Sequence, residues 1–155
     1  MGSLIIENAN LFCGVDQEVI SNGAVYISEG LIQFAGPAQD IPTLDEDIER
    51  FDAQGKFIMP GMTEAHVHLS YNNAHPQKLN IQPLPIAMLD AVDNARVLLG
   101  SGFTSAISFG SAQGLDVPLR DAINAGRVPG PRLAASDRDL GSTGSNADGT
   151  FGGDS

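Results

Sequence analysis

Two histidines separated by one residue form the pattern in this chain most suited to chemistry. His66 and His68 flank Val67 in a run that begins at Pro60-Gly61. In a β-strand, side chains two positions apart point to the same face, so these imidazoles start from backbone positions about 6.6 Å apart. Histidine nitrogens bind Zn²⁺ at about 2.0–2.1 Å, and a catalytic site adds further ligands and a water. The pair therefore predicts half of a metal site.

The alternative interpretation of the pair is structural. Two histidines around a valine in an apolar run can be ordinary strand residues, and a His-X-His pattern alone does not exclude this. The context favours the metal. Apolar neighbours indicate a buried strand, and alternation places Glu64 on the same face as both histidines. A buried carboxylate beside two imidazoles is costly unless something pairs them, and a cation would do so.

The segments that follow the histidines alternate between helix and strand. We expect a buried strand over residues 103–109, a helix over residues 116–125 and a third strand beginning at residues 133–135. Before them, an apolar stripe at helical spacing predicts a helix that ends near Gly100, with these core-facing residues: Met88, Val92, Ala95 and Leu99. Strands alternating with helices are typical of a parallel sheet with right-handed crossovers.

The strand and turn patterns of residues 1–58 predict a separate, small all-β domain. Residues 59–155 are expected to form the second domain. Leu4 to Phe12 is typical of a strand with an Asn-rich break at residues 8–10. Two apolar runs around Glu29-Gly30 predict a hairpin, since glycine supplies the positive φ of a tight turn. A further short strand is expected over residues 48–52.

The histidine run also carries a family resemblance. Gly55 to Gly61, leading into Ala65 to Leu69, resembles the entry to the first barrel strand in the amidohydrolase superfamily of metal-dependent hydrolases. The likeness continues through Gly102 to Ser105 and Leu119 to Leu133, where it is similar to the imidazolonepropionase-like and Xaa-Pro dipeptidase-like branch. It implies an α/β fold, the first part of a (β/α)₈ TIM barrel preceded by a small β-sandwich-type domain.

The resemblance also implies the chemistry. In the resembled family the histidines of the first strand bind a divalent metal, so it assigns His66 and His68 as ligands of one or two ions, with zinc expected. The acid/base aspartate and the other ligands come from later strands and are expected outside this chain. The implied reaction is hydrolysis of an amide, peptide or cyclic-amide C–N bond in a small molecule, by a metal-activated water.

Two departures from the family pattern leave the substrate subclass open. The family commonly has an aspartate where Glu64 stands, and an Arg-Asp pair where this chain has Ile107-Ser108. These differences bear on a simple dipeptidase assignment, but they do not touch the histidines.

Two aperiodic segments lie where barrel enzymes keep their chemistry. Residues 70–85 predict a long loop after the histidine strand, on the active-site face, so Tyr71 and His75 are candidates for substrate contact. The alternative is that both are solvent-facing loop residues. Residues 141–155 are rich in Gly, Ser, Thr, Asn and Asp, a composition typical of a flexible linker or a disordered end. If the strand that begins at residues 133–135 is the third barrel strand, this segment is instead a further active-site loop.

Composition excludes several function classes. With 8 Lys and Arg against 19 Asp and Glu, the formal net charge of −11 would repel nucleic acid. Cys13 is the only cysteine, which fits a reducing compartment. No apolar run approaches the roughly 18 residues of a membrane span. We expect a cytoplasmic protein with no membrane and no nucleic-acid partner.

Length limits what the chain does alone. A complete barrel takes about 250 residues, whereas this chain has 155. We therefore expect the remainder of the barrel in the same polypeptide or in another chain. We also expect the protein to form a homo-oligomer. The alternative hypothesis is a non-catalytic binding or assembly segment that keeps the scaffold without a complete site.

Overall fold

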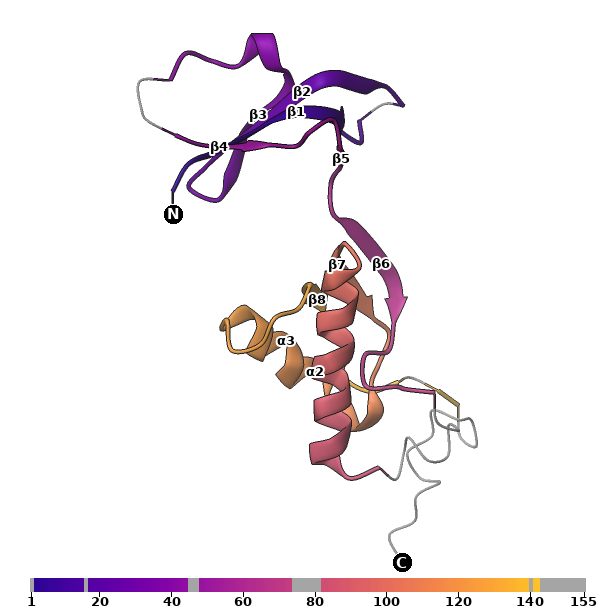
Figure 1. Cartoon of the computed structure of the whole chain (residues 1–155). Coiled ribbons are helices and arrows are strands. Elements are labelled where there is room, and N and C mark those ends of the chain that lie inside the picture. The colour runs from indigo at the N-terminus through magenta and orange to yellow at the C-terminus, as the bar shows by residue number, and fades with distance from the viewer. Residues whose placement is uncertain (1, 16, 45–47, 74–81, 140, 143–155) are drawn as a thin grey trace, which may run out of the picture. The chain divides into compact units, whose positions relative to one another are not determined.

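The computed structural model describes residues 2–15, 17–44, 48–73, 82–139 and 141–142. The chain divides into two units, Met1–Pro60 and Gly61–Ser155 (Figure 1). His75 lies outside the described residues, as do residues 74–81 of the predicted loop over residues 70–85 and most of the segment over residues 141–155. None of the described helices is long and apolar enough to cross a bilayer.

The first unit is a five-stranded sheet. Strands β1, β2 and β3 pair antiparallel, whereas β4 and β5 both run parallel to β1. The order is β3-β2-β1-β4, and β5 also pairs with β1. The elements are β1 (Leu4–Phe12), β2 (Val19–Ser28), β3 (Leu31–Pro37), the 3₁₀ turn η1 (Ala38–Asp40), β4 (Glu49–Asp52) and β5 (Phe57–Ile58). The predicted all-β character of this segment is confirmed.

Turn chemistry explains the hairpin and corrects one detail of β1. Glu29 and Gly30 both have positive φ, at 51° and 76°, which is the two-residue turn that matches the twist of a hairpin. Asn8 also has positive φ, at 55°. The expected break at residues 8–10 is nevertheless wrong: β1 is continuous, and register shifts absorb the irregular residues.

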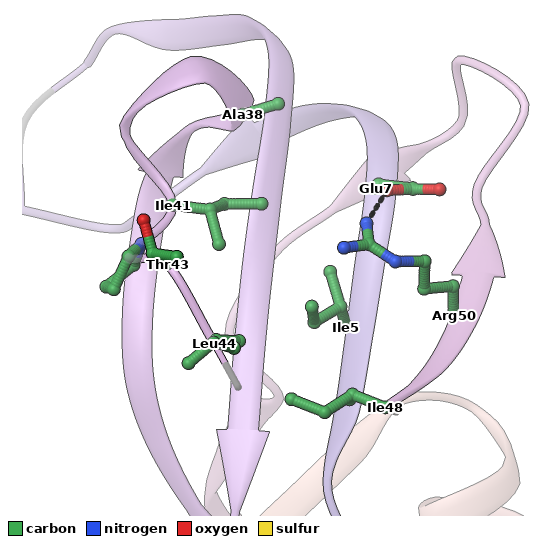
Figure 2. A pocket seen from close by; sticks show the side chains of 9 residues that line it. Ile5, Glu7, Ala38, Ile41, Thr43, Leu44, Ile48 and Arg50 are labelled. Atoms are coloured by element: carbon green, nitrogen blue, oxygen red, sulfur yellow. Dashed lines mark hydrogen bonds and ion pairs between the residues drawn. The ribbon is translucent and has the colours of Figure 1, made fainter. Parts of the chain in front are cut away.

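A pocket of about 400 Å³ lies in this first unit (Figure 2). Its wall combines aliphatic side chains with polar groups, among them Arg50, whose Nη1 pairs with Glu7 Oε2 at 2.6 Å. The lining residues are Ile5, Glu7, Ala38, Ile41, Pro42, Thr43, Leu44, Ile48 and Arg50. None of them belongs to the set that the sequence singles out for chemistry, so this pocket is not the candidate site.

The second unit is a parallel three-stranded sheet with the order β6-β7-β8. Its elements are β6 (Met62–Val67), α2 (Leu84–Gly100), β7 (Phe103–Ser108), the 3₁₀ turn η2 (Ala112–Gly114), α3 (Asp116–Asn124) and β8 (Arg132–Ala134). Pro85 and Pro118 stand in the first turns of the two helices, where a missing N–H costs nothing. The predicted alternation of strands and helices is confirmed, with boundaries shifted by one or a few residues.

Both helices pack on one face of this sheet. Their buried residues form a single core with Leu69 and with the inward residues of the strands: Ala91, Ala95, Ala106, Leu119 and Leu133. The predicted stripe of α2 is displaced, because the residues that α2 buries completely are Ala87, Ala91 and Ala95. Alanines at this spacing let the helix approach the sheet closely, and Val92 packs at the margin.

The expectation of a buried histidine strand is wrong for the described residues. In β6, Thr63, Ala65 and His66 are exposed, and only Glu64 and Val67 are half-buried. Among the strands that the structure describes in this chain, β6 pairs only with β7, and the core formed with the two helices lies on one face of the sheet, so the other face is uncovered here. Ile107 on the neighbouring strand is likewise 40% exposed.

Side-chain hydrogen bonds tie together the loops that follow the three parallel strands. Ser70 Oγ accepts the backbone N–H of Ala112 at 2.8 Å. Asp116, which is fully buried, accepts from Ser111 Oγ and from the backbone N–H of Ser136, both at 3.0 Å. These bonds satisfy buried polar groups and fix the carboxyl ends of the strands against one another.

We predict that Asn94 of α2 fixes the chain just after the histidines. Its Nδ2 donates to the carbonyls of Leu69 and Tyr71 at 2.8 and 2.9 Å. Asn94→Ala removes both bonds and should lower the free energy of unfolding by about 1–3 kcal/mol in urea titrations. Asp93→Ala, at an exposed position of the same helix, should change it by less than about 0.5 kcal/mol. Equal effects of the two variants would contradict the assignment.

Candidate metal centre

The rings of His66 and His68 converge at the end of β6. Their Nε2 atoms lie 3.3 Å apart, although His66 is exposed and His68 is half-buried. Two nitrogens that bind one Zn²⁺ ion tetrahedrally at about 2.0–2.1 Å are separated by about 3.3 Å. The observed spacing therefore equals one edge of a tetrahedral zinc site. It equally permits a direct hydrogen bond between the rings when no cation is bound.

The surroundings of His68 favour the tautomer that a metal requires. Its Nδ1 lies 2.9 Å from the carbonyl oxygen of Gly110. A carbonyl can only accept a hydrogen bond, so this contact holds the proton on Nδ1 and leaves the lone pair on Nε2. Metal-binding histidines commonly use the second ring nitrogen in this way.

Two aromatic side chains hold the imidazoles in place. Phe109, which follows β7, stacks on His66 with ring centroids 4.4 Å apart and planes 11° from parallel. Tyr71 stacks on His68 at 5.0 Å and 15°. Each ring therefore has an aromatic neighbour that restricts its rotation.

Tyr71 and Asp139 form a second layer behind His68. The Tyr71 hydroxyl donates a short hydrogen bond to Asp139 Oδ2. Burial raises the pKa of Tyr71, and the hydrogen bond to Asp139 and the charge of that carboxylate raise it further. The other oxygen, Asp139 Oδ1, lies 3.3 Å from His68 Nδ1. A carboxylate thus faces the ring nitrogen that points away from His66.

The structure brings together only some of the site residues that the sequence predicts. It brings His66, His68 and Tyr71 together, whereas His75 lies outside the described residues. The expectation that Glu64 shares the face of the histidines is wrong. Glu64 pairs in register with core-facing Ala106, and the register then shifts before Val67, which breaks the simple alternation. Its Oε1 accepts the backbone N–H of His66 at 3.2 Å.

Sequence reasoning missed three residues of this site: Phe109, Gly110 and Asp139. All three follow the carboxyl ends of β7 and β8, the same edge at which His68 follows β6. That common edge was the available signal, since neighbouring parallel strands bring their carboxyl ends together. Among the residues that the structure describes, no group of three or more His, Cys, Asp or Glu side chains is arranged to hold a metal ion.

Comparison with known proteins supplies the family. No family model matches the chain. The imidazolonepropionase of Colwellia psychrerythraea is 39% identical over 69 residues, which cover 41% of this chain and 16% of that protein. The imidazolonepropionase of Bacillus mycoides is 28% identical over 90 residues, covering 58% of this chain and 20% of that protein.

Solved structures extend the similarity to nearly the whole chain. A Xaa-Pro dipeptidase with bound methionine in its active site superposes with a TM-score of 0.82 at 26% identity, over 98% of this chain and 37% of that chain. An amidohydrolase crystal structure superposes with a TM-score of 0.74 at 27% identity, covering 84% and 30%. The chain is an amidohydrolase-superfamily protein.

The predicted resemblance and fold class are thereby confirmed. The proteins that this chain resembles include ones named imidazolonepropionase, Xaa-Pro dipeptidase and prolidase. Its strands and helix–strand units fit the opening part of a barrel that is incomplete here. The chain spans 16% of the length of the first curated relative and 20% of the second, so the activity of the whole protein is a matter for proposal.

We predict that Gly110 must lack a side chain for this site to form. A Cβ at Gly110, where φ is +122°, would lie 2.0 Å from Asp139 Oδ1 and 2.5 Å from the Asp139 backbone nitrogen. Gly110→Ala should cost at least about 2–3 kcal/mol of unfolding free energy. Gly126→Ala is the matched control, because Gly126 also has positive φ but no atom within 4 Å of its added Cβ, and it should cost about 1 kcal/mol. Equal losses in urea titrations would be inconsistent with the close approach.

We predict that Tyr71 ionises above the ordinary tyrosine pKa of about 10. The folded chain binds the phenol proton more tightly than the unfolded chain. The resulting stability is fully present below the unfolded pKa and is lost as the pH rises through the folded pKa. An absorbance titration of Tyr26→Phe, which leaves Tyr71 as the only tyrosine, should locate this raised midpoint. Adding Asp139→Asn to this variant should lower the titration midpoint of Tyr71. A Tyr71 midpoint at the ordinary tyrosine pKa in the folded chain would refute the raised pKa.

Proposed function

We propose that His66 and His68 are two ligands of a catalytic divalent cation, zinc, in a metal-dependent amidohydrolase. The observation that carries the proposal is the 3.3 Å separation of the two Nε2 atoms, which suits adjacent positions of a tetrahedral site. The contact between His68 Nδ1 and the Gly110 carbonyl supports it, because it leaves the His68 Nε2 lone pair available.

The proposed reaction is hydrolysis of an amide, peptide or cyclic-amide C–N bond. A bound zinc ion would supply Lewis acidity for the substrate's carbonyl group and would lower the pKa of a bound water to about 7. The protein's part is to hold the ligand rings. Phe109 and Tyr71 stack on them, and the loops after β6 and β7 are joined by the bond between Ser70 and Ala112.

The substrate class is proposed from the relatives. Similar proteins are named imidazolonepropionase, Xaa-Pro dipeptidase and prolidase. We propose a small-molecule amide or peptide substrate that approaches the open face of the sheet. On that face Ile107 is 40% exposed and Phe109 is 51% exposed, so the surface beside the histidines is partly apolar. Tyr71 and His75 remain proposed substrate contacts.

The rest of the catalytic machinery belongs to the same proposal. We propose that the acid/base aspartate and the remaining ligands come from further strands of the barrel, in this polypeptide or in another chain. We further propose that the site holds one or two ions and that residues 1–58 and 59–155 form the two domains. We also propose that the protein is a homo-oligomer and lies in the cytoplasm. The alternative, a non-catalytic binding or assembly segment that keeps the scaffold without a complete site, predicts no hydrolysis even when any partner chain is present.

Replacement of the histidines tests the proposal directly. His66→Ala and His68→Ala in the full protein should each weaken zinc binding by more than about 100-fold. Replacing a residue that only hydrogen-bonds to a metal ligand costs up to about 100-fold, and the loss of a ligand itself should cost more. Hydrolysis of a panel of Xaa-Pro dipeptides and cyclic amides should fall in parallel. Zinc content is measured by elemental analysis and affinity by competition with a chelator.

His75→Ala is the control for that experiment, since it removes the remaining histidine of the chain. It should leave zinc binding within about tenfold of the parent protein, because the proposed site does not use it as a ligand. Unchanged zinc content and activity in both His66→Ala and His68→Ala would remove the proposal. Zinc binding without hydrolysis of any substrate would favour the non-catalytic alternative.

A further inference from the structure

Asp139 is a carboxylate that the sequence did not single out and that the fold carries to the histidines. It lies after β8, next to Arg138, whose backbone forms a parallel bridge with Ser111 in the loop after β7. This bridge draws the segment toward the carboxyl end of the sheet. The Asp139 side chain is only 20% exposed, and its oxygen Oδ1 is buried without a hydrogen bond of good geometry.

The buried oxygen faces one specific proton donor. Asp139 Oδ1 lies 3.3 Å from His68 Nδ1, the same nitrogen that approaches the Gly110 carbonyl at 2.9 Å. A buried carboxylate oxygen without a donor is costly, and a Nδ1–H shared between the two acceptors reduces that cost. The pair therefore stabilises one tautomer of His68 from two directions.

Tyr71 closes the arrangement from the other side. Its hydroxyl donates to Asp139 Oδ2 while its ring stacks on the ring of His68 at 5.0 Å. The carboxylate thus has one oxygen held by Tyr71 and the other directed at His68. Gly110 makes room for it, because a Cβ there would meet Asp139 Oδ1 at 2.0 Å.

We propose that Asp139, held by Tyr71, is a positioning residue that keeps the His68 proton on Nδ1 and directs the Nε2 lone pair toward His66. The expected effect of Asp139 on metal affinity rests on the proposed zinc site, whereas its effect on the His68 tautomer does not depend on that site. Asp139 does not join the ligand set, because it approaches Nδ1 and not Nε2.

The first test needs no metal. Imidazole nitrogen chemical shifts of the metal-free full protein report the tautomer of His68, with His68→Gln used to assign its signals. The expected result is a predominant Nδ1–H form in the parent protein. In Asp139→Asn, which is nearly isosteric, the Nε2–H form should gain population. A predominant Nε2–H form in the parent, or the same tautomer ratio in both proteins, would overturn the proposal.

The second test measures zinc affinity by competition with a chelator. Asp139→Asn should weaken binding by about 10–100-fold, as expected for an outer partner of a ligand. Tyr71→Phe keeps the stacked ring but loses the hydroxyl, and should weaken it by a smaller factor. Asp93→Asn, which removes the same charge at an exposed position of α2, should leave affinity unchanged. Equal effects of Asp139→Asn and Asp93→Asn would overturn the positioning role.

The two readouts separate failure of this proposal from failure of the proposed function. If His66→Ala and His68→Ala bind zinc like the parent, the metal site is wrong, yet the tautomer measurement still tests Asp139. If zinc requires both histidines but neither tautomer nor affinity responds to Asp139→Asn, the metal site holds and the positioning role is refuted.

Discussion

The hydrogen bond between His68 Nδ1 and the Gly110 carbonyl joins the ends of two parallel strands and links the fold to the chemistry. It exists because β6 and β7 run in the same direction and deliver their carboxyl ends to one edge. The bond from Ser70 to Ala112 and the contacts of buried Asp116 hold the same edge together. Without that rigid edge, the spacing of the imidazoles would not be defined.

Much of the fold could be predicted because its signals are local. The turn at Glu29-Gly30, the existence of helix α2 and the glycines after helices depend on residues close in sequence, although the face that α2 buries does not. The convergence of His66 and His68 was predictable for the same reason, since it follows from their spacing. The register shift between Glu64 and Val67, which places Glu64 on the other face from the histidines, could not be predicted, because the prediction assumed that side chains alternate regularly along the strand.

What sequence reasoning missed depends on contacts between distant residues. Asp139 meets Tyr71 and His68 only because β8 joins the sheet beside β7. The fully buried face of α2 consists of small alanines, which a search for large apolar residues passes over. The exposure of β6 is that of the strands present in this chain, and among the described strands only β7 pairs with it.

The most direct measurement is X-ray absorption spectroscopy of the zinc-loaded full protein, compared with the same protein carrying His66→Ala and His68→Ala together. The account predicts at least two imidazole nitrogens at about 2.0–2.1 Å from zinc, and the loss of two imidazoles from the coordination shell in the double variant. An unchanged zinc spectrum after both substitutions would contradict it.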